Sequence, residues 1–250
     1  MEYNKSKHIK SPLNYTGGKS KLLPQILPLF PDKVGTFVDL FCGGCNVGVN
    51  VTADKVIYND FMPQIIELFK NWKEANVNET TQYIDQQVEK FGLSKYNQDG
   101  FLELRKQYNE SKDIRDLFVL AAYAFNHQIR FNSKGEYNMP FGKDRSAYNK
   151  TMKNNLVKFI TRIKEQNSVF LNKSFDELDI KNFNNDTFVY ADPPYLITSA
   201  CYNAVWNEEM EYKLLEYLDK CTECGIKFAL SNVLEMNDKS NDILKNWCKE

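Results

Sequence analysis

The tetrapeptide Asp192-Pro193-Pro194-Tyr195 is the segment of this 250-residue chain whose residue types best fit a chemical task. It follows the apolar run 187–191, which predicts a buried strand, and the carboxyl ends of such strands are where open α/β sheets bind ligands. The prolines stiffen the backbone, so the carboxylate of Asp192 and the carbonyl of Pro193 can point at one place. Two acceptors suit an exocyclic NH2 group, and Tyr195 offers a flat face for stacking. The motif predicts a pocket for an aromatic amine such as N6 of adenine; the alternative is a plain proline turn.

A second candidate element is Phe41-Cys42-Gly43-Gly44, which ends an apolar strand predicted over 36–41. Small residues there let a ligand approach backbone N–H groups at the start of a helix. The strand predicted over 55–59 is followed by Asp60, and an acid at this place can bond both hydroxyls of a ribose. Asp60 can equally cap a helix that begins at Phe61, so both interpretations stay open.

Two glycine-containing segments do not complete known phosphate-binding motifs. Gly18-Lys19-Ser20 lacks the earlier glycine that a P-loop needs, because that position is Leu13. Gly43-Gly44 is not the dinucleotide fingerprint, since Cys45 stands where the second glycine of that motif belongs. The sequence therefore argues against a Walker A site and against a nicotinamide dinucleotide site.

Strands and helices alternate at both ends of the chain, which predicts a parallel α/β sheet covered on both faces. The strands are expected at 36–41, 55–59, 168–171, 187–191 and 226–231. The helices are expected at 19–30 (interrupted by proline), 61–74, three times within 79–127, and at 150–165, 207–223 and 240–248. Residues 130–148 are rich in Asn, Gly, Lys and Arg and predict a loop or hairpin. The helical stretch between the second and third strands is expected to be an inserted domain.

A net charge of −1 hides two opposite stretches. Residues 130–164 carry 9 basic and 2 acidic residues, whereas residues 165–250 carry 8 basic and 16 acidic ones. A solvated helix face and a surface that meets nucleic-acid phosphates both fit the basic stretch.

Composition excludes several classes of protein. Hydrophobic residues make up 42% and charged residues 26%, which is ordinary for a globular chain and excludes a disordered chain, a fibre and a coiled coil. No stretch approaches the ~20 apolar residues of a membrane span, and the first residues lack the apolar segment of a secretory signal, so the expected location is the cytoplasm. The pairs Cys42/Cys45 and Cys221/Cys224 lie far apart without nearby histidines, so we expect free thiols and no metal site.

Together these motifs resemble the alpha group of adenine-N6 DNA methyltransferases, and within it the phage-type members of the Dam family. The resemblance rests on Asn14-Tyr15-Thr16-Gly17-Gly18-Lys19, on the turn at Phe41 and on Asp192-Pro193-Pro194-Tyr195, and it runs through most of the chain. It implies a Rossmann-like, S-adenosylmethionine-dependent methyltransferase sheet with an inserted, mostly helical target-recognition domain. The catalytic domain would be discontinuous, at 1–61 and 166–250, and the insertion would occupy 62–165 with a DNA-contacting hairpin at about 126–145.

The resemblance also implies roles for single residues. Cofactor-binding positions would be Tyr15, Gly17, Lys19, Asp39, Phe41, Gly43, Asp60, Phe175 and Asp192. Catalytic positions would be Asp192, Pro193, Pro194 and Tyr195. DNA-binding positions would be Asn126, Gln128, Arg130, Asn132, Lys134, Pro140, Lys143 and Arg145. Arg130 matches the arginine that contacts a guanine in the family. Arginine suits this contact because its guanidinium group reaches O6 and N7 of guanine together. The alternative for Arg130 is a salt bridge to Glu136.

The activity that the resemblance implies is methyl transfer from S-adenosylmethionine, leaving S-adenosylhomocysteine, to N6 of an adenine within GATC. The adenine must leave the stack of duplex DNA to react, and no metal or membrane is involved. We expect a monomer, or a dimer when bound to DNA. Two other functions stay open: methylation of RNA adenine or of a glutamine side chain in the same pocket, and a DNA-binding module without activity.

Two departures from the family pattern bear on these expectations. Asn14 stands where enterobacterial members have a lysine, so one guanine contact is missing or comes from elsewhere. Family members continue beyond the helix expected at 240–248 with two strands that complete the sheet. We therefore expect the catalytic domain to lack those strands here and the strand at 226–231 to be an exposed edge.

Overall fold

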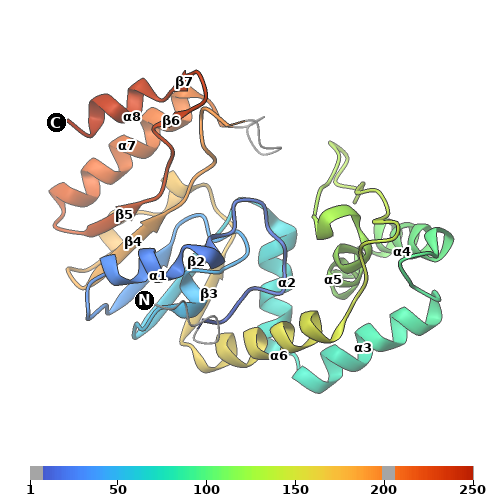
Figure 1. Ribbon diagram of the computed structural model, residues 1–250. Coiled ribbons are helices and arrows are strands. Elements are labelled where there is room, and N and C mark those ends of the chain that lie inside the picture. The colour runs from blue at the N-terminus through green and yellow to red at the C-terminus, as the bar shows by residue number, and fades with distance from the viewer. Residues whose placement is uncertain (1–7, 199–205, 250) are drawn as a thin grey trace. The chain divides into compact units, whose positions relative to one another are not determined.

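The computed structural model describes residues 8–198 and 206–249, and within them five strands form one parallel sheet (Figure 1). The strands are β1 (Thr36–Asp39), β2 (Lys55–Asn59), β3 (Ser168–Leu171), β4 (Thr187–Ala191) and β5 (Lys227–Leu230), in the order β3-β2-β1-β4-β5. Every neighbouring pair is parallel. The predicted α/β fold with a parallel sheet is confirmed.

The order of the strands reverses at β1. From β1 the chain builds outward through β2 to β3, then returns to the other side of β1 to form β4 and β5. All five residues of β4 are buried, as its continuous apolar run predicts, whereas β5 pairs only with β4 and is partly exposed. Ligands of open α/β sheets bind at the carboxyl ends of the strands flanking such a reversal, so the ends of β1 and β4 mark the candidate site.

Prolines set the bounds of the first helices. The helix expected at 19–30 is a series of short turns: η1 (Lys19–Lys21), α1 (Leu23–Ile26) and η2 (Leu27–Leu29). Pro24 and Pro28 lack the N–H donors that a continuous helix would need. The next helix, α2 (Pro63–Glu74), begins two residues later than expected because Pro63 occupies its first position, where a missing N–H costs nothing.

One compact unit is built of helices and comprises residues 1–21, 43–50 and 62–166. Its further helices are α3 (Val77–Lys90), α4 (Gln98–Ser111), α5 (Ile114–Tyr123), α6 (Lys150–Glu165) and the short η3 (Gly48–Asn50) and η4 (Phe125–His127). Helix α5 buries nine of its residues and is therefore the centre of this unit. The Trp72 ring of α2 meets Phe118 edge-on at 5.4 Å and Phe159 at 6.0 Å.

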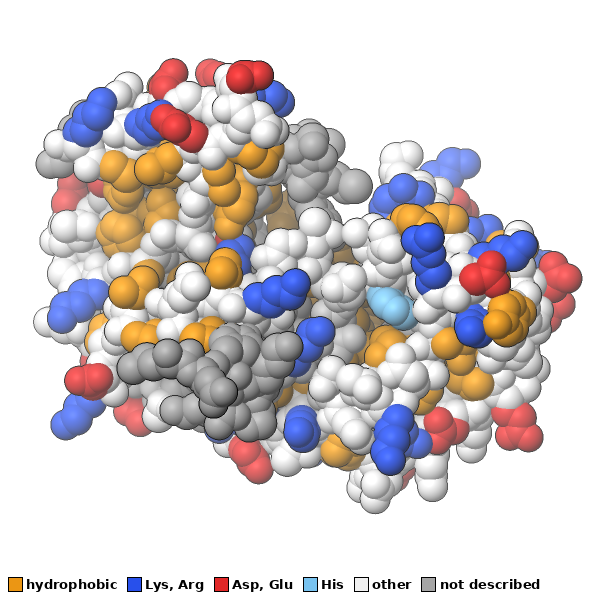
Figure 2. Space-filling view, in the orientation of Figure 1, with side chains coloured by type: hydrophobic (Ala, Val, Ile, Leu, Met, Phe, Trp, Pro, Cys, Tyr) orange, Lys and Arg blue, Asp and Glu red, His pale blue; other side chains and the backbone are white. Residues whose placement is uncertain are grey.

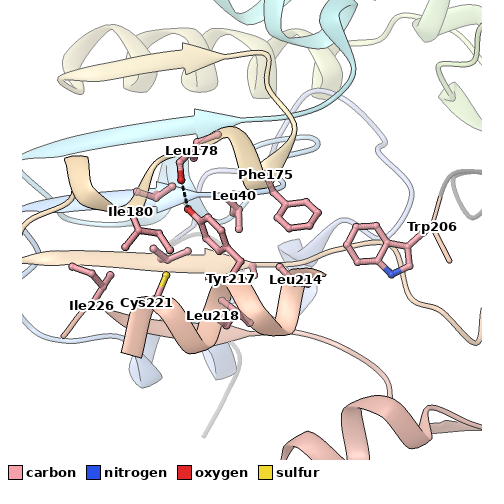
Figure 3. Packing of buried hydrophobic residues seen from close by; sticks show 13 residues of the cluster. Leu40, Phe175, Leu178, Ile180, Trp206, Leu214, Tyr217, Leu218, Cys221 and Ile226 are labelled. Carbon is pink, nitrogen blue, oxygen red and sulfur yellow. Dashed lines mark hydrogen bonds between the residues drawn. The ribbon is translucent and has the colours of Figure 1, made fainter. Parts of the chain in front are cut away.

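The other compact unit carries the sheet and comprises residues 22–42, 51–61 and 167–250. Its further elements are η5 (Phe175–Glu177), η6 (Ile180–Asn182), α7 (Glu208–Glu223), α8 (Asp242–Trp247) and the small hairpin β6 (Glu235–Met236) and β7 (Lys239–Ser240), which the sequence did not predict. Its core joins α7 to the sheet through Leu214, Leu218 and Cys221 (Figure 3). Burial raises the pKa of the Cys221 thiol to about 12, so this thiol stays protonated.

The two units differ from the predicted domains at two segments. Residues 8–21 and 43–50 cluster with the helices, although they were predicted to belong to the catalytic domain. Compactness does not assign a function, so the roles of both domains stay predictions.

Membrane-spanning helices, metal ligands and disulfides can be searched for in the described part of the chain. No helix there is long and apolar enough to cross a membrane. No three His, Cys, Asp or Glu residues there converge as metal ligands, and none of the five cysteines it contains forms a disulfide. The sixth cysteine, Cys201, lies outside the described residues.

Candidate active site and nucleic-acid interface

Three acidic residues of the sheet unit lie at the carboxyl edge of the parallel strands. Asp39 ends β1, Asp60 follows β2, and Asp192 follows β4. Because β1 pairs in register with both neighbours, Asp39 lies beside Tyr58 and Tyr190 on the adjacent strands. Asp39 is 2% and Asp60 9% exposed, so both carboxylates are withdrawn from the solvated surface, which is uncommon for aspartate.

The Asp192 motif forms a small hydrogen-bonded turn. The Tyr195 hydroxyl donates to Oδ1 of Asp192 at 3.0 Å. The backbone N–H and the hydroxyl of Thr198 both donate to the carbonyl of Tyr195, at 3.1 and 3.0 Å. Pro193 is buried, whereas Asp192, Pro194 and Tyr195 are half-buried. The motif is thus a loop held by hydrogen bonds, in which the Asp192 carboxylate and the Tyr195 ring are partly accessible.

Asp60 is held by the last residue of β3 and by the side chain that follows it. Its N–H donates to the carbonyl of Leu171 at 3.2 Å, and its carbonyl accepts from Nδ2 of Asn172 at 2.8 Å. Helix α2 begins at Pro63 with Met62 at the N-cap position, so the alternative of a helix that starts at Phe61 with Asp60 as its cap is wrong.

Asn59, which the sequence analysis did not select, fixes the two segments on either side of β2. Its Nδ2 donates to the carbonyl of Leu40, just after β1, and to the carbonyl of Lys173, both at 3.1 Å. Its Oδ1 accepts from the Lys173 N–H, also at 3.1 Å. Asn59 therefore holds the exits of β1 and β3 at the carboxyl edge. Only its place at the end of a predicted strand hinted at this role.

Aromatic rings line the same edge of the sheet unit. Phe41 lies 5.4 Å from Phe175 between ring centroids, and Trp206 meets these rings at 5.7 and 5.9 Å. Figure 3 shows Phe175 and Trp206 with their rings turned toward each other at one end of the buried cluster. Phe41 and Phe175 were predicted site residues, whereas Trp206 belongs to no motif and was not predicted.

The remaining predicted cofactor residues belong to the helical unit. Gly43 has φ +48, and a Cβ there would lie 2.8 Å from Cδ1 of Tyr15, so the ring of Tyr15 lies directly against this glycine. Lys19 is 6% exposed, and its Nζ donates to the carbonyl of Gly17 at 3.0 Å. The structure therefore brings Tyr15 to Gly43, and Lys19 to Gly17.

We expect Gly43→Ala to lower the free energy of unfolding by about 2 kcal/mol, because a left-handed φ and a steric overlap act together. Gly225→Ala is the matched control, since Gly225 has φ +73 and nothing within 4 Å of its Cβ position. Gly225→Ala should lower the free energy of unfolding by only about 1 kcal/mol, because it adds backbone strain but no steric overlap. Urea unfolding of both variants measures the difference. Equal losses would contradict a close approach of Tyr15.

A hairpin carries the predicted DNA-binding residues in the helical unit. Isolated antiparallel bridges pair Phe131 with Tyr137 and Ala124 with Phe141. Arg130 donates from Nε to Oδ1 of Asn138 at 2.8 Å and from Nη2 to the carbonyl of Asn138 at 3.0 Å.

The carboxylate of Glu136 accepts from Asn132 instead of Arg130, at 2.8 Å, so the alternative of an Arg130–Glu136 salt bridge is wrong. Oδ1 of Asn132 accepts from the N–H groups of Lys134 and Glu136. Asn132 thus shapes the turn of the hairpin.

The N-terminal segment is fastened to the base of this hairpin. Nδ2 of Asn14 donates to the carbonyl of Asn126 at 2.8 Å, and Nε2 of Gln128 donates to Oγ1 of Thr16 at 3.4 Å. Asn126 and the next residue, His127, both have left-handed φ, of 53° and 55°. Asn14, the departure from the family pattern, therefore supports a strained turn that carries two predicted base-contacting residues.

The basic stretch divides into surface cations and cations that hold the fold. Lys134, Lys143 and Arg145 are exposed, and Lys and Arg side chains (blue) are scattered over the helical unit at right in Figure 2. On α6, Lys153 pairs with Asp85 at 2.6 Å, and Arg162 donates to the carbonyl of Val49 at 3.2 Å.

Lys164 performs a similar structural task. Its Nζ donates to three carbonyls at the end of α2, those of Lys73, Glu74 and Ala75. These carbonyls lack partners within their own helix, so a cation there stabilises the helix terminus. Some cations of the basic stretch thus hold the fold, and a contact of the exposed ones with phosphates stays a prediction.

A hollow of about 480 Å³ in the sheet unit lies elsewhere. Its lining residues include Phe188, near the start of β4, and Lys227 and Phe228, at the start of β5. These are the amino ends of the strands, opposite the edge that carries Asp192. The hollow is therefore not the candidate site.

Comparisons with known proteins agree with this geometry. A family model described as D12 class N6 adenine-specific DNA methyltransferase matches residues 15–250. The chain is 46% identical over 247 residues to the modification methylase StsI of Streptococcus sanguinis. The aligned residues make up 96% of this chain and 38% of StsI. The chain is 44% identical over 255 aligned residues to the type II methyltransferase M.FokI of Planomicrobium okeanokoites, covering 100% and 39%. It is 28% identical over 230 residues to the DNA adenine methylase of Escherichia coli K12, covering 88% and 79%.

Proposed function

Because the chain belongs to the D12 class of N6 adenine-specific DNA methyltransferases, we propose that it transfers a methyl group from S-adenosylmethionine to N6 of an adenine in duplex DNA. The observation that carries the proposal is the fastened Asp192–Tyr195 loop directly after β4, at the edge where Asp39 and Asp60 also lie. The chain spans 38% and 39% of the length of StsI and M.FokI, so the proposal concerns the activity of the matched part.

The residues of the sheet unit fit S-adenosylmethionine. The Asp60 carboxylate would bind the ribose hydroxyls, and the ring of Phe175 would pack against the adenine of the cofactor. The ring of Phe41, 5.4 Å from that of Phe175, would lie beside the methionine part. When bound, the cofactor supplies an electrophilic methyl group on sulfur. Asp39 and Asp192 add acceptors for its ammonium group.

The family resemblance also gives a cofactor-binding role to four residues that belong to the helical unit. Tyr15, Lys19 and the backbone at Gly17 and Gly43 are proposed to bind the methionine part. The resemblance of residues 14–19 and of the turn at 41–44 to the family motifs supports this assignment.

Asp192 and the Pro193 carbonyl are proposed to accept the two hydrogens of the target NH2 group. Holding both hydrogens draws the nitrogen lone pair out of conjugation with the ring, which makes N6 nucleophilic. Tyr195 stacks on the flipped base, and its hydrogen bond to Asp192 sets the orientation of both side chains before the base arrives. Catalysis then rests on positioning and electrostatics.

The hairpin is proposed to read the DNA. Arg130 would contact a guanine, with Asn126, Gln128 and Pro140 as neighbouring base contacts and Asn132 shaping the turn. Lys134, Lys143 and Arg145 would contact phosphates, because they are exposed cations. The resemblance to Dam proteins implies GATC as the target, with the protein acting as a monomer or as a dimer on DNA in the cytoplasm.

Transfer of a labelled methyl group from S-adenosylmethionine to two duplexes tests the proposal. One duplex contains GATC, and the other has its first G·C pair replaced. Label in the GATC duplex alone supports both the activity and the target sequence. Label in both duplexes supports the activity but shows that the target is not GATC. Label only in a plasmid that carries other adenine sites leads to the same conclusion. An RNA hairpin and a glutamine peptide are the negative substrates. Label in either of these alone, or no label with intact DNA binding, contradicts the proposal.

A further inference from the structure

Glu211 is a fully buried carboxylate that no part of the proposed chemistry uses. Its exposure is 0%, although it lies in the first turn of α7 among the exposed residues Glu208 and Glu209. Within the described residues no lysine or arginine pairs with it. A buried carboxylate without a cation is costly unless several hydrogen bonds replace its water. The donors that surround it therefore indicate what it does.

Three side chains of the sheet unit donate to Glu211. Oε2 accepts from the indole Nε1 of Trp206 at 2.7 Å. Oε1 accepts from Nδ2 of Asn232 at 3.1 Å and from Nδ2 of Asn241 at 2.8 Å. Asn232 follows β5, and Asn241 caps α8 by accepting from the N–H of Leu244. One carboxylate thus joins three segments that are separate in the sequence.

Trp206 connects this carboxylate to the candidate cofactor site. Its ring is 6% exposed and meets Phe41 edge-on at 5.7 Å and Phe175 at 5.9 Å. The bond from Nε1 to Glu211 sets the orientation of the indole, because the ring has only this one donor. The position of the Phe41–Phe175 wall therefore depends on a group outside it.

We infer that Glu211 is a positioning residue for the cofactor pocket, which holds Trp206 against Phe41 and Phe175. The inference rests on the proposed function, since it takes these two rings as the cofactor-binding wall. Glu211 touches neither cofactor nor DNA in this account. It acts through the indole that it orients.

The variant Glu211→Gln tests the inference. A glutamine of the same shape accepts at one end only, so its NH2 group must face either the indole N–H or the two asparagine NH2 groups. We expect the Kd for S-adenosylhomocysteine, measured by calorimetry on the full chain, to rise about tenfold. Methyl transfer should show a raised KM for the cofactor with kcat much less affected, because the Asp192 loop is unchanged.

Glu209→Gln is the matched control on the same helix. Glu209 is exposed and pairs with Lys213 at 2.7 Å across one turn, so its change should leave Kd and KM as in the original chain. Trp206→Phe provides a second test, since it keeps a ring but removes the donor. In that background, Glu211→Gln should change Kd by much less than tenfold, because the conflict with the indole N–H is gone.

Three results would contradict a positioning role for Glu211. A lowered melting temperature of Glu211→Gln with unchanged Kd and KM would make Glu211 a purely structural residue and overturn the inference. An equal change of Kd with and without Trp206 would also overturn it. Phe175→Ala separates the inference from the proposed function: if it leaves Kd unchanged, or if the original chain does not bind S-adenosylhomocysteine, the pocket itself is wrong and the inference fails with it.

Discussion

Replacement of Asp192 by alanine is expected to lower methyl transfer by about 10²–10³-fold while leaving the affinity for duplex DNA unchanged. The carboxylate is half-buried at the end of β4 and accepts the Tyr195 hydroxyl at 3.0 Å, so its loss removes an acceptor for the target amine and frees the ring meant to stack on it. Single-turnover transfer of labelled methyl groups measures the rate. Gel-shift titration measures the affinity.

Asp186→Ala is the matched control for this experiment. Asp186 is exposed and directly precedes the same strand β4, at the end opposite Asp192. The control should transfer methyl groups at the normal rate. If Asp192→Ala were as active as Asp186→Ala, the chain would be a DNA-binding module or an enzyme with a different pocket.

Replacement of Arg130 by alanine is expected to cost about 1–3 kcal/mol of DNA affinity at one G·C pair and little at a site that already lacks that pair. Two bonds to Asn138 hold the guanidinium through Nε and one hydrogen of Nη2. Nη1 and the other Nη2 hydrogen can then donate to O6 and N7 of a guanine, and a fork held in place loses less entropy on binding. Competition between matched and substituted duplexes measures the specificity.

Lys134→Ala separates base reading from phosphate contact. Lys134 is an exposed cation on the same hairpin, so its loss should weaken binding to all duplexes alike. The slope of the logarithm of the binding constant against the logarithm of salt concentration should become shallower by about one. A uniform loss for Arg130→Ala as well would identify Arg130 as a phosphate contact.

The elements with strong local signals were predicted closely. The bounds of α6, β2, β3 and β4 match the expected ranges, because each is an apolar pattern of one period between polar residues. The interruption by proline predicted for the helix at 19–30 is confirmed, and Pro24 and Pro28 divide it into short turns. The β6–β7 hairpin was missed because two-residue strands carry no periodic pattern.

The parts of the candidate site that the sequence could not predict are contacts between distant segments. Asn59 bonds to Lys173, Asn14 bonds to Asn126, and Glu211 bonds to Asn241. Each pair consists of common polar residues whose partners are set by the folded sheet or hairpin rather than by spacing. The motif residues could be selected because their types are unusual, whereas the residues that hold them are ordinary Asn and Glu.

The strand order has a consequence for how the chain acquires its structure. Val56 of β2 pairs with Ser168 of β3, and Thr36 of β1 pairs with Thr187 of β4, so the sheet closes loops of more than a hundred residues. Ribosomes add about 5–20 residues per second, and contacts between distant residues form slowly. The first two strands therefore leave the ribosome several seconds before their outer partners exist, while the intervening helices can already form from local contacts. During this interval β1 and β2 are apolar strands with open edges, which can pair with other chains.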